Sequence, residues 1–263
     1  MNILVTINKN YLFKMFTMIN SLSCNNKGLH DVFVVSNDVT IDDLSKYKND
    51  NIVFHLISYF DEKLEQAPTS KRYPSVIYYR LLAAKYLPSD VDKILYLDPD
   101  IIVLKDLSSF YNQSMKDIYY IGASNVKKTL RKFNEVKNSA PKDSPYINTG
   151  VILINVKELR NKDQSQEIYD YILKKRMVLT LPDQDILQGL YGDKVKLVDH
   201  YLYNLSDRAI NAYNRTHIKS KIDESWVEKN CYIIHFLGRN KPWKENYVGI
   251  LKQYYLNYEI KEK

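Results

Sequence analysis

Residues 93–104 read Lys93-Ile-Leu-Tyr-Leu-Asp-Pro-Asp-Ile-Ile-Val-Leu104, an apolar run that two carboxylates, Asp98 and Asp100, interrupt. In a regular strand these two side chains would point the same way, because side chains repeat every two residues. Pro99 lacks a backbone N–H and favours ending or bending the strand there. Ionised carboxylates in apolar surroundings need partners, and one divalent cation satisfies two of them. We therefore expect a strand end that carries a metal site.

The surrounding sequence alternates between short apolar runs and helical patterns. Strands are predicted at residues 3–7, 32–36, 52–57, 119–123, 151–155 and 232–236. Helices are predicted at residues 12–22, 41–47, 76–86, 164–175 and 182–191. Alternation of this kind is typical of βαβ units. The predicted fold class is therefore α/β, with a mostly parallel central sheet flanked by helices and ligands at the carboxyl ends of its strands.

Length and composition indicate one compact domain. The chain has 263 residues, of which 45% are hydrophobic and 26% charged, as in ordinary globular proteins. No internal repeat or linker is evident, so we expect a domain over residues 1–243 with a small helical, basic and aromatic extension over 244–263. The lysine-rich stretch 125–144 is expected to be a mobile loop that could act as a lid.

Two features predict a cytoplasmic location. Cys24 and Cys231 are the only cysteines, which excludes a disulfide scaffold and suits a reducing compartment. The apolar runs are too short to span a bilayer, and no basic segment precedes a signal-type apolar core at the N-terminus.

The formal net charge of +7 and the isoelectric point near 9.0 suggest anionic partners such as a nucleotide or phospholipid headgroups. An A/T-rich coding sequence would explain the same charge, because lysine, asparagine, isoleucine and tyrosine are all abundant. Nucleic acid is not expected as a partner, since the lysines are spread along the chain and no RNA-binding signature or zinc-finger spacing is present.

Several other candidate site residues also have purely structural explanations. Asp183 and Gln184 open a predicted helix, where the helix dipole alone favours acidic side chains. His235 ends an apolar strand and could be a satisfied core residue, although Gly238 and Lys241 behind it suit a phosphate.

Two further candidates lie in ordinary-looking segments. Asn148 belongs to Asn148-Thr149-Gly150, which precedes a predicted strand and could form a plain turn. Arg80 lies within an amphipathic helical pattern and could equally be a surface ion-pair residue.

As an ordered set, these motifs closely resemble retaining glycosyltransferases of family 8, the bacterial galactosyl- and glucosyltransferases related to glycogenin. The resemblance spans about residues 3–243. The motifs that carry it are Asn10-Tyr11, Tyr79-Arg80-Leu81, Leu95-Tyr-Leu-Asp-Pro-Asp100, Tyr146-Ile-Asn-Thr-Gly-Val-Ile-Leu-Ile-Asn155, Asp183-Gln-Asp-Ile-Leu187 and His235-Phe-Leu-Gly-Arg-Asn-Lys-Pro-Trp243. It implies a GT-A fold and a UDP-hexose-dependent enzyme. Such an enzyme moves glucose or galactose, with retained configuration, to a hydroxyl of a glycan, glycopeptide or glycolipid.

The resemblance also implies roles for individual residues. The metal ligands would be Asp98, Asp100 and His235. The uridine would be held by the backbone of Thr6, Ile7 and Asn8 and by the ring of Tyr11. The diphosphate site would comprise Asp98, Pro99, Gly238 and Lys241. The catalytic residues around the transferred sugar would be Arg80, Asn148, Asp183 and Gln184.

Two carboxylates and an imidazole suit Mn²⁺ better than Mg²⁺, although Mg²⁺ would also be accepted. The cation and Lys241 would neutralise the charge that grows on the UDP leaving group. Gln184 lies where a nucleophile is expected in this family, but an amide is a poor one. We therefore favour front-face attack over double displacement through Asp183, with Gln184 or Asp183 stabilising the oxocarbenium-like state.

The chain departs from the family pattern at two places. It has Asn8-Lys9 where related enzymes commonly carry an acid after the first strand, and Asn125-Val126 where relatives often place an acid near the acceptor. Two other classes of protein would share part of this pattern. A haloacid-dehalogenase-type phosphatase also has Asp-x-Asp after a strand, but Ile101-Ile102 does not supply its usual turn. A catalytically silent nucleotide-sugar-binding scaffold is the second alternative.

The C-terminal segment mixes aromatic and basic residues and has two interpretations. It could form an interfacial helix that contacts the inner membrane face and reaches a lipid-linked acceptor. Packing of Ile250, Leu251, Tyr254 and Tyr255 against the core would explain the same pattern.

Overall fold

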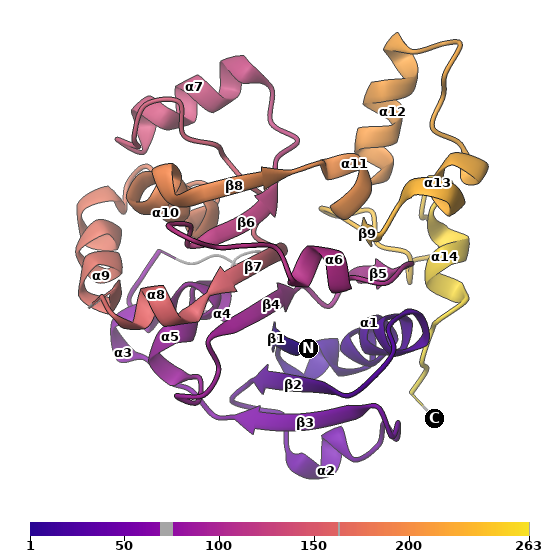
Figure 1. Cartoon of the computed structure of the whole chain (residues 1–263), viewed down its shortest axis with the longest axis horizontal. Coiled ribbons are helices and arrows are strands. Elements are labelled where there is room, and N and C mark those ends of the chain that lie inside the picture. Colours follow the sequence, from indigo (N-terminus) through magenta and orange to yellow (C-terminus); the bar gives the residue numbers. More distant parts are fainter. Residues whose placement is uncertain (69–75, 163, 263) are drawn as a thin grey trace.

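A twisted seven-stranded sheet forms the centre of the molecule, and helices cover both of its faces (Figure 1). The computed structural model describes residues 1–68, 76–162 and 164–262. The strand order is β3-β2-β1-β4-β7-β6-β8, and β7 runs antiparallel to both of its neighbours. These strands are β1 (Asn2–Thr6), β2 (His30–Val35), β3 (Ile52–Ile57), β4 (Lys93–Leu97), β6 (Tyr120–Ala123), β7 (Val151–Asn155) and β8 (Val195–Val198). The predicted mostly parallel α/β sheet is confirmed.

The helices agree with the sequence prediction where their apolar pattern is strong. In the described part of the chain they are α1 (Leu12–Asn25), α2 (Ile41–Leu44), α3 (Glu62–Glu65), α4 (Val76–Tyr79), α5 (Ala83–Tyr86), α6 (Ser108–Tyr111), α7 (Lys128–Lys137), α8 (Val156–Arg160), α9 (Gln164–Lys175), α10 (Pro182–Tyr191), α11 (His200–Tyr203), α12 (Asp207–Thr216), α13 (Glu224–Asn230) and α14 (Lys252–Leu256). The 3₁₀ turns are Lys9–Tyr11, Arg80–Leu82 and Gly192–Lys194. The bounds of α9 and α10 match the prediction, whereas the helix predicted at 76–86 is interrupted by the second of these turns.

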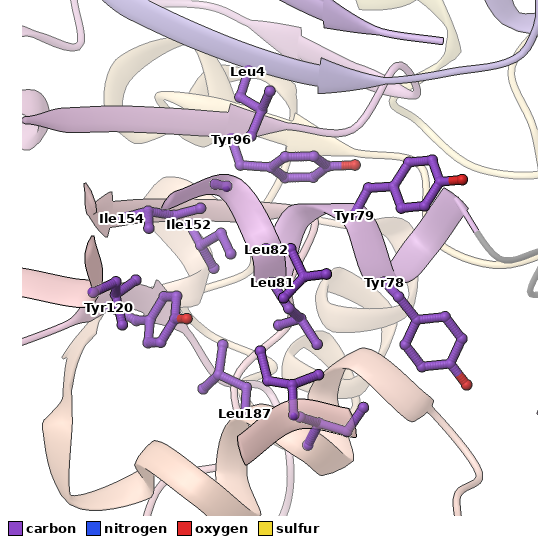
Figure 2. Packing of buried hydrophobic residues seen from close by; sticks show 14 of the residues in the cluster. Leu4, Tyr78, Tyr79, Leu81, Leu82, Tyr96, Tyr120, Ile152, Ile154 and Leu187 are labelled. Carbon is purple, nitrogen blue, oxygen red and sulfur yellow. The ribbon is translucent and has the colours of Figure 1, made fainter. Parts of the chain in front are cut away.

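The sheet is buried on both faces, which explains the continuous apolar runs in its central strands. Along β4, Ile94 and Tyr96 enter one hydrophobic cluster, and Leu95 and Leu97 enter the other. Figure 2 shows the first cluster, in which the ring of Tyr96 lies beside Leu4. Because both faces are covered, the end of β4 is where this strand can present polar groups.

A second, two-stranded sheet follows directly from the Asp98–Asp100 turn. It pairs β5 (Ile101–Val103) with β9 (Ile233–His235) in antiparallel register, with Ile101 opposite His235. The strand predicted at 232–236 therefore exists but is shorter and lies outside the central sheet. The N–H of Phe236 donates to the carbonyl of Asp100 at 3.0 Å, so this pairing brings the last strand to the carboxylate turn.

The prediction of a mobile loop at 125–144 was wrong. This stretch contains α7, and the C-terminal end of α7 is anchored to α10. The carboxylate of Asp185 accepts from Lys137 Nζ at 2.8 Å and from Asn138 Nδ2 at 3.1 Å. It also accepts from the backbone N–H of Thr180 at 2.7 Å, and Asp185 is fully buried. The lysine-rich sequence of α7 did not indicate a helix, because the contacts of this helix with the rest of the fold are largely polar.

Replacing Asp185 with alanine is expected to lower the free energy of unfolding by about 3–5 kcal/mol, because the substitution leaves Lys137 without its carboxylate in a nearly buried position. Urea unfolding measures the loss. Asp193→Ala, at an exposed position just beyond α10, is the matched control and should change stability by less than about 0.5 kcal/mol. Equal losses in the two variants would contradict the anchoring role.

The C-terminal segment packs against the protein's own core. Leu251 and Tyr255 are buried with residues of β9, and the N–H of Ile260 donates to Thr17 Oγ1 of α1 at 3.0 Å. The packing explanation therefore holds for Leu251 and Tyr255, whereas Ile250 is exposed. The predicted membrane contact receives no support. Among the described residues, none of the helices has the length and apolar character that crossing a bilayer demands.

Candidate active site

Asp98, Asp100 and His235 converge at the junction of the two sheets. The N–H of Asp98 donates to the carbonyl of Gly150 at 2.8 Å, which fixes the turn to the start of β7. His235 Nε2 lies 3.2 Å from Asp100 Oδ1 and 3.7 Å from Asp98 Oδ2. One ligand atom from each of the three residues lies within 4.8 Å of the others. Two carboxylates and one imidazole that face a common point fit a divalent transition metal such as Mn²⁺.

The imidazole of His235 is held in place by a residue that the sequence did not single out. Asn204 Oδ1 lies 2.8 Å from His235 Nδ1, which leaves Nε2 facing the carboxylates. His235 is only 2% exposed, and the N–H of His235 donates to the carbonyl of Leu205 beside Asn204. A partner on the second ring nitrogen is the usual way in which proteins orient a ligating histidine.

Replacing Asn204 with alanine is expected to weaken Mn²⁺ binding by about 10–100-fold, because the imidazole loses the contact that orients it. Titration of Mn²⁺ followed by electron paramagnetic resonance measures the affinity. Asn230→Ala, which removes an asparagine from the end of α13 away from the metal cluster, is the matched control. An unchanged Mn²⁺ affinity in Asn204→Ala would show that packing alone orients the ring.

Gly150 is required by the site itself, so the Asn148–Gly150 segment is more than a plain turn. A Cβ at this position would overlap His235 Cε1 and lie 2.5 Å from Asp98 Oδ2. The side chain of Asn148 is directed at the same turn, since its Oδ1 accepts from the N–H of Gly150 at 3.1 Å. A glycine here allows the two sheets to bring their polar side chains together.

Arg80 connects the carboxylate turn with the start of α10, and its interpretation as a surface residue is wrong. It is 6% exposed, and its Nη2 lies 3.1 Å from Asp98 Oδ1 while Nη1 lies 3.5 Å from Asp183 Oδ2. Nη1 also donates to the carbonyl of Thr149 at 3.0 Å, and the guanidinium lies 4.2 Å from the ring centre of Tyr96. The 3₁₀ turn within the predicted helix is the segment that carries Arg80.

Asp183 is buried in the same cluster and does more than stabilise a helix end. Its Oδ2 accepts from Thr149 Oγ1 at 2.6 Å and faces Arg80. Burial raises the pKa of Asp183 above the ordinary value, and Arg80 opposes this rise. Asp185, two residues further along, accepts from the N–H groups of Thr180 and Leu181 just before the helix.

Lys241 reaches the opposite side of the carboxylate turn. Its ammonium contacts Asp100 Oδ2 and donates to the carbonyl of Phe236 at 2.8 Å. Burial by itself would raise the pKa of Asp100, but His235 and Lys241 outweigh it and hold that pKa well below its ordinary value. Gly238, between them in sequence, has a φ of +79° and so forms the tight bend that turns the chain back toward Lys241.

The residues predicted to hold a nucleoside lie at the end of β1. Thr6 Oγ1 lies 3.0 Å from the hydroxyl of Tyr96, which in turn donates to Asp98 Oδ1 at 2.7 Å. Tyr11 is 37% exposed, and its ring meets Trp243 edge-on with 6.3 Å between centroids. Asn8 is exposed.

The predicted residues fall into two groups by their contacts in the described structure. Contacts join one group into a cluster around the carboxylate turn, with Thr6 connected through the hydroxyl of Tyr96: Thr6, Arg80, Asp98, Asp100, Asp183, His235 and Lys241. No side-chain contact to that cluster is seen in the described structure for the other predicted residues: Ile7, Asn8, Tyr11, Pro99, Asn148, Gln184 and Gly238.

Comparisons with known proteins agree with this geometry. Lipopolysaccharide 1,2-glucosyltransferase of Escherichia coli is 29% identical over 199 residues, which cover 70% of this chain but 54% of that protein. Lipopolysaccharide 1,3-galactosyltransferase of Salmonella typhimurium is 26% identical over 273 residues, covering 97% of this chain and 76% of that protein. The chain thus spans about half the length of the first relative and about three quarters of the second.

Solved structures share the fold. Galactosyltransferase LgtC, determined with donor and acceptor sugar analogues, superposes with a TM-score of 0.82 at 20% identity. The match covers 98% of this chain and 95% of the LgtC chain. Glycosyltransferase GlyE of Streptococcus pneumoniae superposes with a TM-score of 0.73 at 20% identity. The match covers 99% of this chain and 61% of the GlyE chain. The chain therefore has the GT-A fold. The model of glycosyl transferase family 8 matches residues 2–247, nearly the whole chain, and this protein belongs to that family.

Proposed function

We propose that this protein is a metal-dependent retaining hexosyltransferase that moves glucose or galactose from a UDP-sugar to a hydroxyl of a glycan, glycopeptide or glycolipid. The observation that carries the proposal is the convergence of Asp98, Asp100 and His235 beside the ammonium of Lys241. Family membership and the glucosyl- and galactosyltransferase names of the relatives support a hexose donor. Neither a phosphatase nor a silent scaffold receives support from the comparisons.

Asp98, Asp100 and His235 would hold the cation. The imidazole favours Mn²⁺ over Mg²⁺, because Mg²⁺ prefers oxygen ligands alone. When bound, the cation would stabilise negative charge on the diphosphate as the glycosidic bond breaks.

Lys241 would add a second positive charge at the leaving group. Its ammonium contacts Asp100, which holds it beside the metal ligands. A preorganised cation stabilises developing charge without reorganisation at the moment of reaction. The bend at Gly238 would bring backbone N–H groups close to the same phosphates.

The sugar would lie near Arg80, Asn148, Asp183 and Gln184, and we favour front-face attack there. Asp183 is buried and engaged by Thr149 and Arg80, which restrains it from attacking the anomeric carbon. Gln184 is half-buried and carries an amide, which is a weak nucleophile. The departing phosphate would accept the proton of the acceptor hydroxyl, while Asp183 and Gln184 stabilise positive charge on the sugar ring.

Uridine recognition would use the end of β1. The backbone of Thr6, Ile7 and Asn8 would meet the ribose and base, and the exposed ring of Tyr11 would stack on uracil. Since Asn8 and Lys9 are not acidic, contacts to the base would come from amide and backbone groups.

A panel of UDP-sugars tests the proposal. We expect UDP release from UDP-glucose or UDP-galactose in Mn²⁺, loss of release after chelation with EDTA, and a product whose anomeric proton in NMR shows retained configuration. Absence of both UDP binding and UDP release for every donor would overturn the proposal. A covalent sugar trapped on Asp183 would overturn front-face attack alone.

A further inference from the structure

A cavity of about 720 Å³ lies beside the candidate site, between α12 and the loop that follows β9. Figure 1 shows α12 rising beside β9 at the upper right, and Ile210 of α12 packs with Ile234 and Phe236 in one buried cluster. The cavity touches the residues proposed for the donor through His235 and Gly238. Its size is that of a pocket for a small ligand.

One face of α12 supplies the far wall of this cavity. Arg208, Asn211, Ala212 and Arg215 line it, and their spacing of three, four and seven residues places them on one side of a helix. Arg239 lines it from the opposing loop. We call this space the arginine cavity.

The three guanidinium groups belong to exposed side chains that carry no ion pair in the described part of the chain. Among residues 1–68, 76–162 and 164–262, no ion pair or side-chain hydrogen bond is recorded for Arg208, Arg215 or Arg239. Asp207 is the one carboxylate of the described lining, and it is engaged elsewhere. It accepts from the hydroxyl of Tyr247 and from the N–H of Ile250 at 3.0 Å. The described lining of the cavity therefore carries three guanidinium groups against one carboxylate, which is a net positive charge.

The position of the arginine cavity separates it from most of the proposed donor site. In the described structure its lining includes neither the end of β1, proposed for the uridine, nor Arg80 and Asp183, proposed for the sugar. A donor bound as proposed would touch it only at His235 and Gly238. The rest of the cavity is then available to the second substrate.

We propose that the arginine cavity binds a phosphate or carboxylate group of the acceptor, so that the acceptor is an anionic glycan or glycolipid. The inference rests on the proposed transferase function and specifies its acceptor class. Arginine suits both anions, because its planar fork donates two parallel hydrogen bonds to phosphate or carboxylate oxygens. A neutral sugar carries no charge to attract these guanidinium groups.

Calorimetry on the full chain, saturated with UDP and Mn²⁺, tests the inference. Glucose 6-phosphate, glucuronate and glucose are the probes, and we expect at least one of the two anions to bind at least about tenfold more tightly than glucose. Whichever anion binds identifies the group. The variant with Arg208→Gln and Arg215→Gln should lose at least about tenfold of this affinity. Arg176→Gln, at an exposed position after α9, should lose none.

Two outcomes would overturn this inference and leave the proposed function intact. Both anions could bind no better than glucose although UDP binds, or the double variant could lose affinity for UDP, which would assign Arg208 and Arg215 to the donor diphosphate. Unchanged UDP affinity in the double variant also shows that it is folded. Failure of the unmodified protein to bind or hydrolyse any UDP-sugar would instead contradict the proposed function, and the acceptor assignment with it.

Discussion

Replacing Asp98 and Asp100 together with asparagine is expected to lower Mn²⁺-dependent release of UDP from the donor by about a thousandfold or more. The reason is charge. The two carboxylates supply both anionic ligands of the three-residue cluster, and a lost metal removes several kcal/mol of leaving-group stabilisation. Initial rates of UDP release at saturating donor, measured across a Mn²⁺ titration, give the effect.

The same variant separates metal binding from folding. Asparagine is close to aspartate in shape, and removing Asp100 also leaves the ammonium of Lys241 without its carboxylate. Circular dichroism should show a folded protein, while the affinity for UDP should no longer depend on Mn²⁺. Asp90→Asn, at an exposed position before β4, is the matched control and should keep full activity. Mn²⁺-dependent UDP binding that survives the double substitution would show that the metal ligands lie elsewhere.

The central sheet could be predicted from sequence because its strands are buried on both faces. Residues 151–154 of β7 are apolar, and the short length and β-branched content of this run favour a strand over a buried helix. The weakly patterned elements were missed for the opposite reason. Strand β8 is half-buried or exposed along its length, and α12 buries only Ala209 and Ile210.

The candidate site was predictable as a set of residues but not as a network. The Asp98-Pro99-Asp100 turn carries its own signal, since apolar residues flank two carboxylates. The positions of Arg80 and Asn204 carry none, because an arginine in a helical pattern and an asparagine in a loop are common everywhere. The bridge between Leu205 and Ile234 of β9, which are far apart in sequence, brings Asn204 to His235. Contacts that depend on long-range pairing leave no local trace in the sequence.

The stretch containing α7 illustrates a different limit. Its exposed side chains include Leu130, Phe133 and Val136, so the usual rule that apolar residues face the core fails there. The helix is joined to the fold through Lys137 and Asn138, which read as solvent-exposed polar residues in the sequence. Both residues donate to the carboxylate of Asp185, and the burial of Asp185 is visible only in the folded structure.

Arg80→Met is expected to destabilise the protein by about 3–5 kcal/mol at neutral pH and to lower turnover by about a hundredfold or more. Methionine keeps much of the side-chain length but removes the charge that lies between Asp98 and Asp183. Two carboxylates would then face each other across a buried space without a cation. Arg80→Lys should recover part of the stability but little activity, because one ammonium cannot bridge both carboxylates and the carbonyl of Thr149.

The pH dependence of this loss distinguishes the ionic role of Arg80 from simple packing. Burial already raises the pKa of Asp183, and removing Arg80 should raise it further, above its value in the unfolded chain. The folded variant then binds more protons than the unfolded one, so its stability falls as pH rises through the raised pKa. Urea unfolding should therefore show a stability deficit that is larger at pH 8 than at pH 5, by roughly 1 kcal/mol or more. Arg176→Met should show no deficit at either pH. A deficit for Arg80→Met that is equal at both would mean that the lost contacts with Tyr96, rather than the unpaired carboxylates, cause the instability.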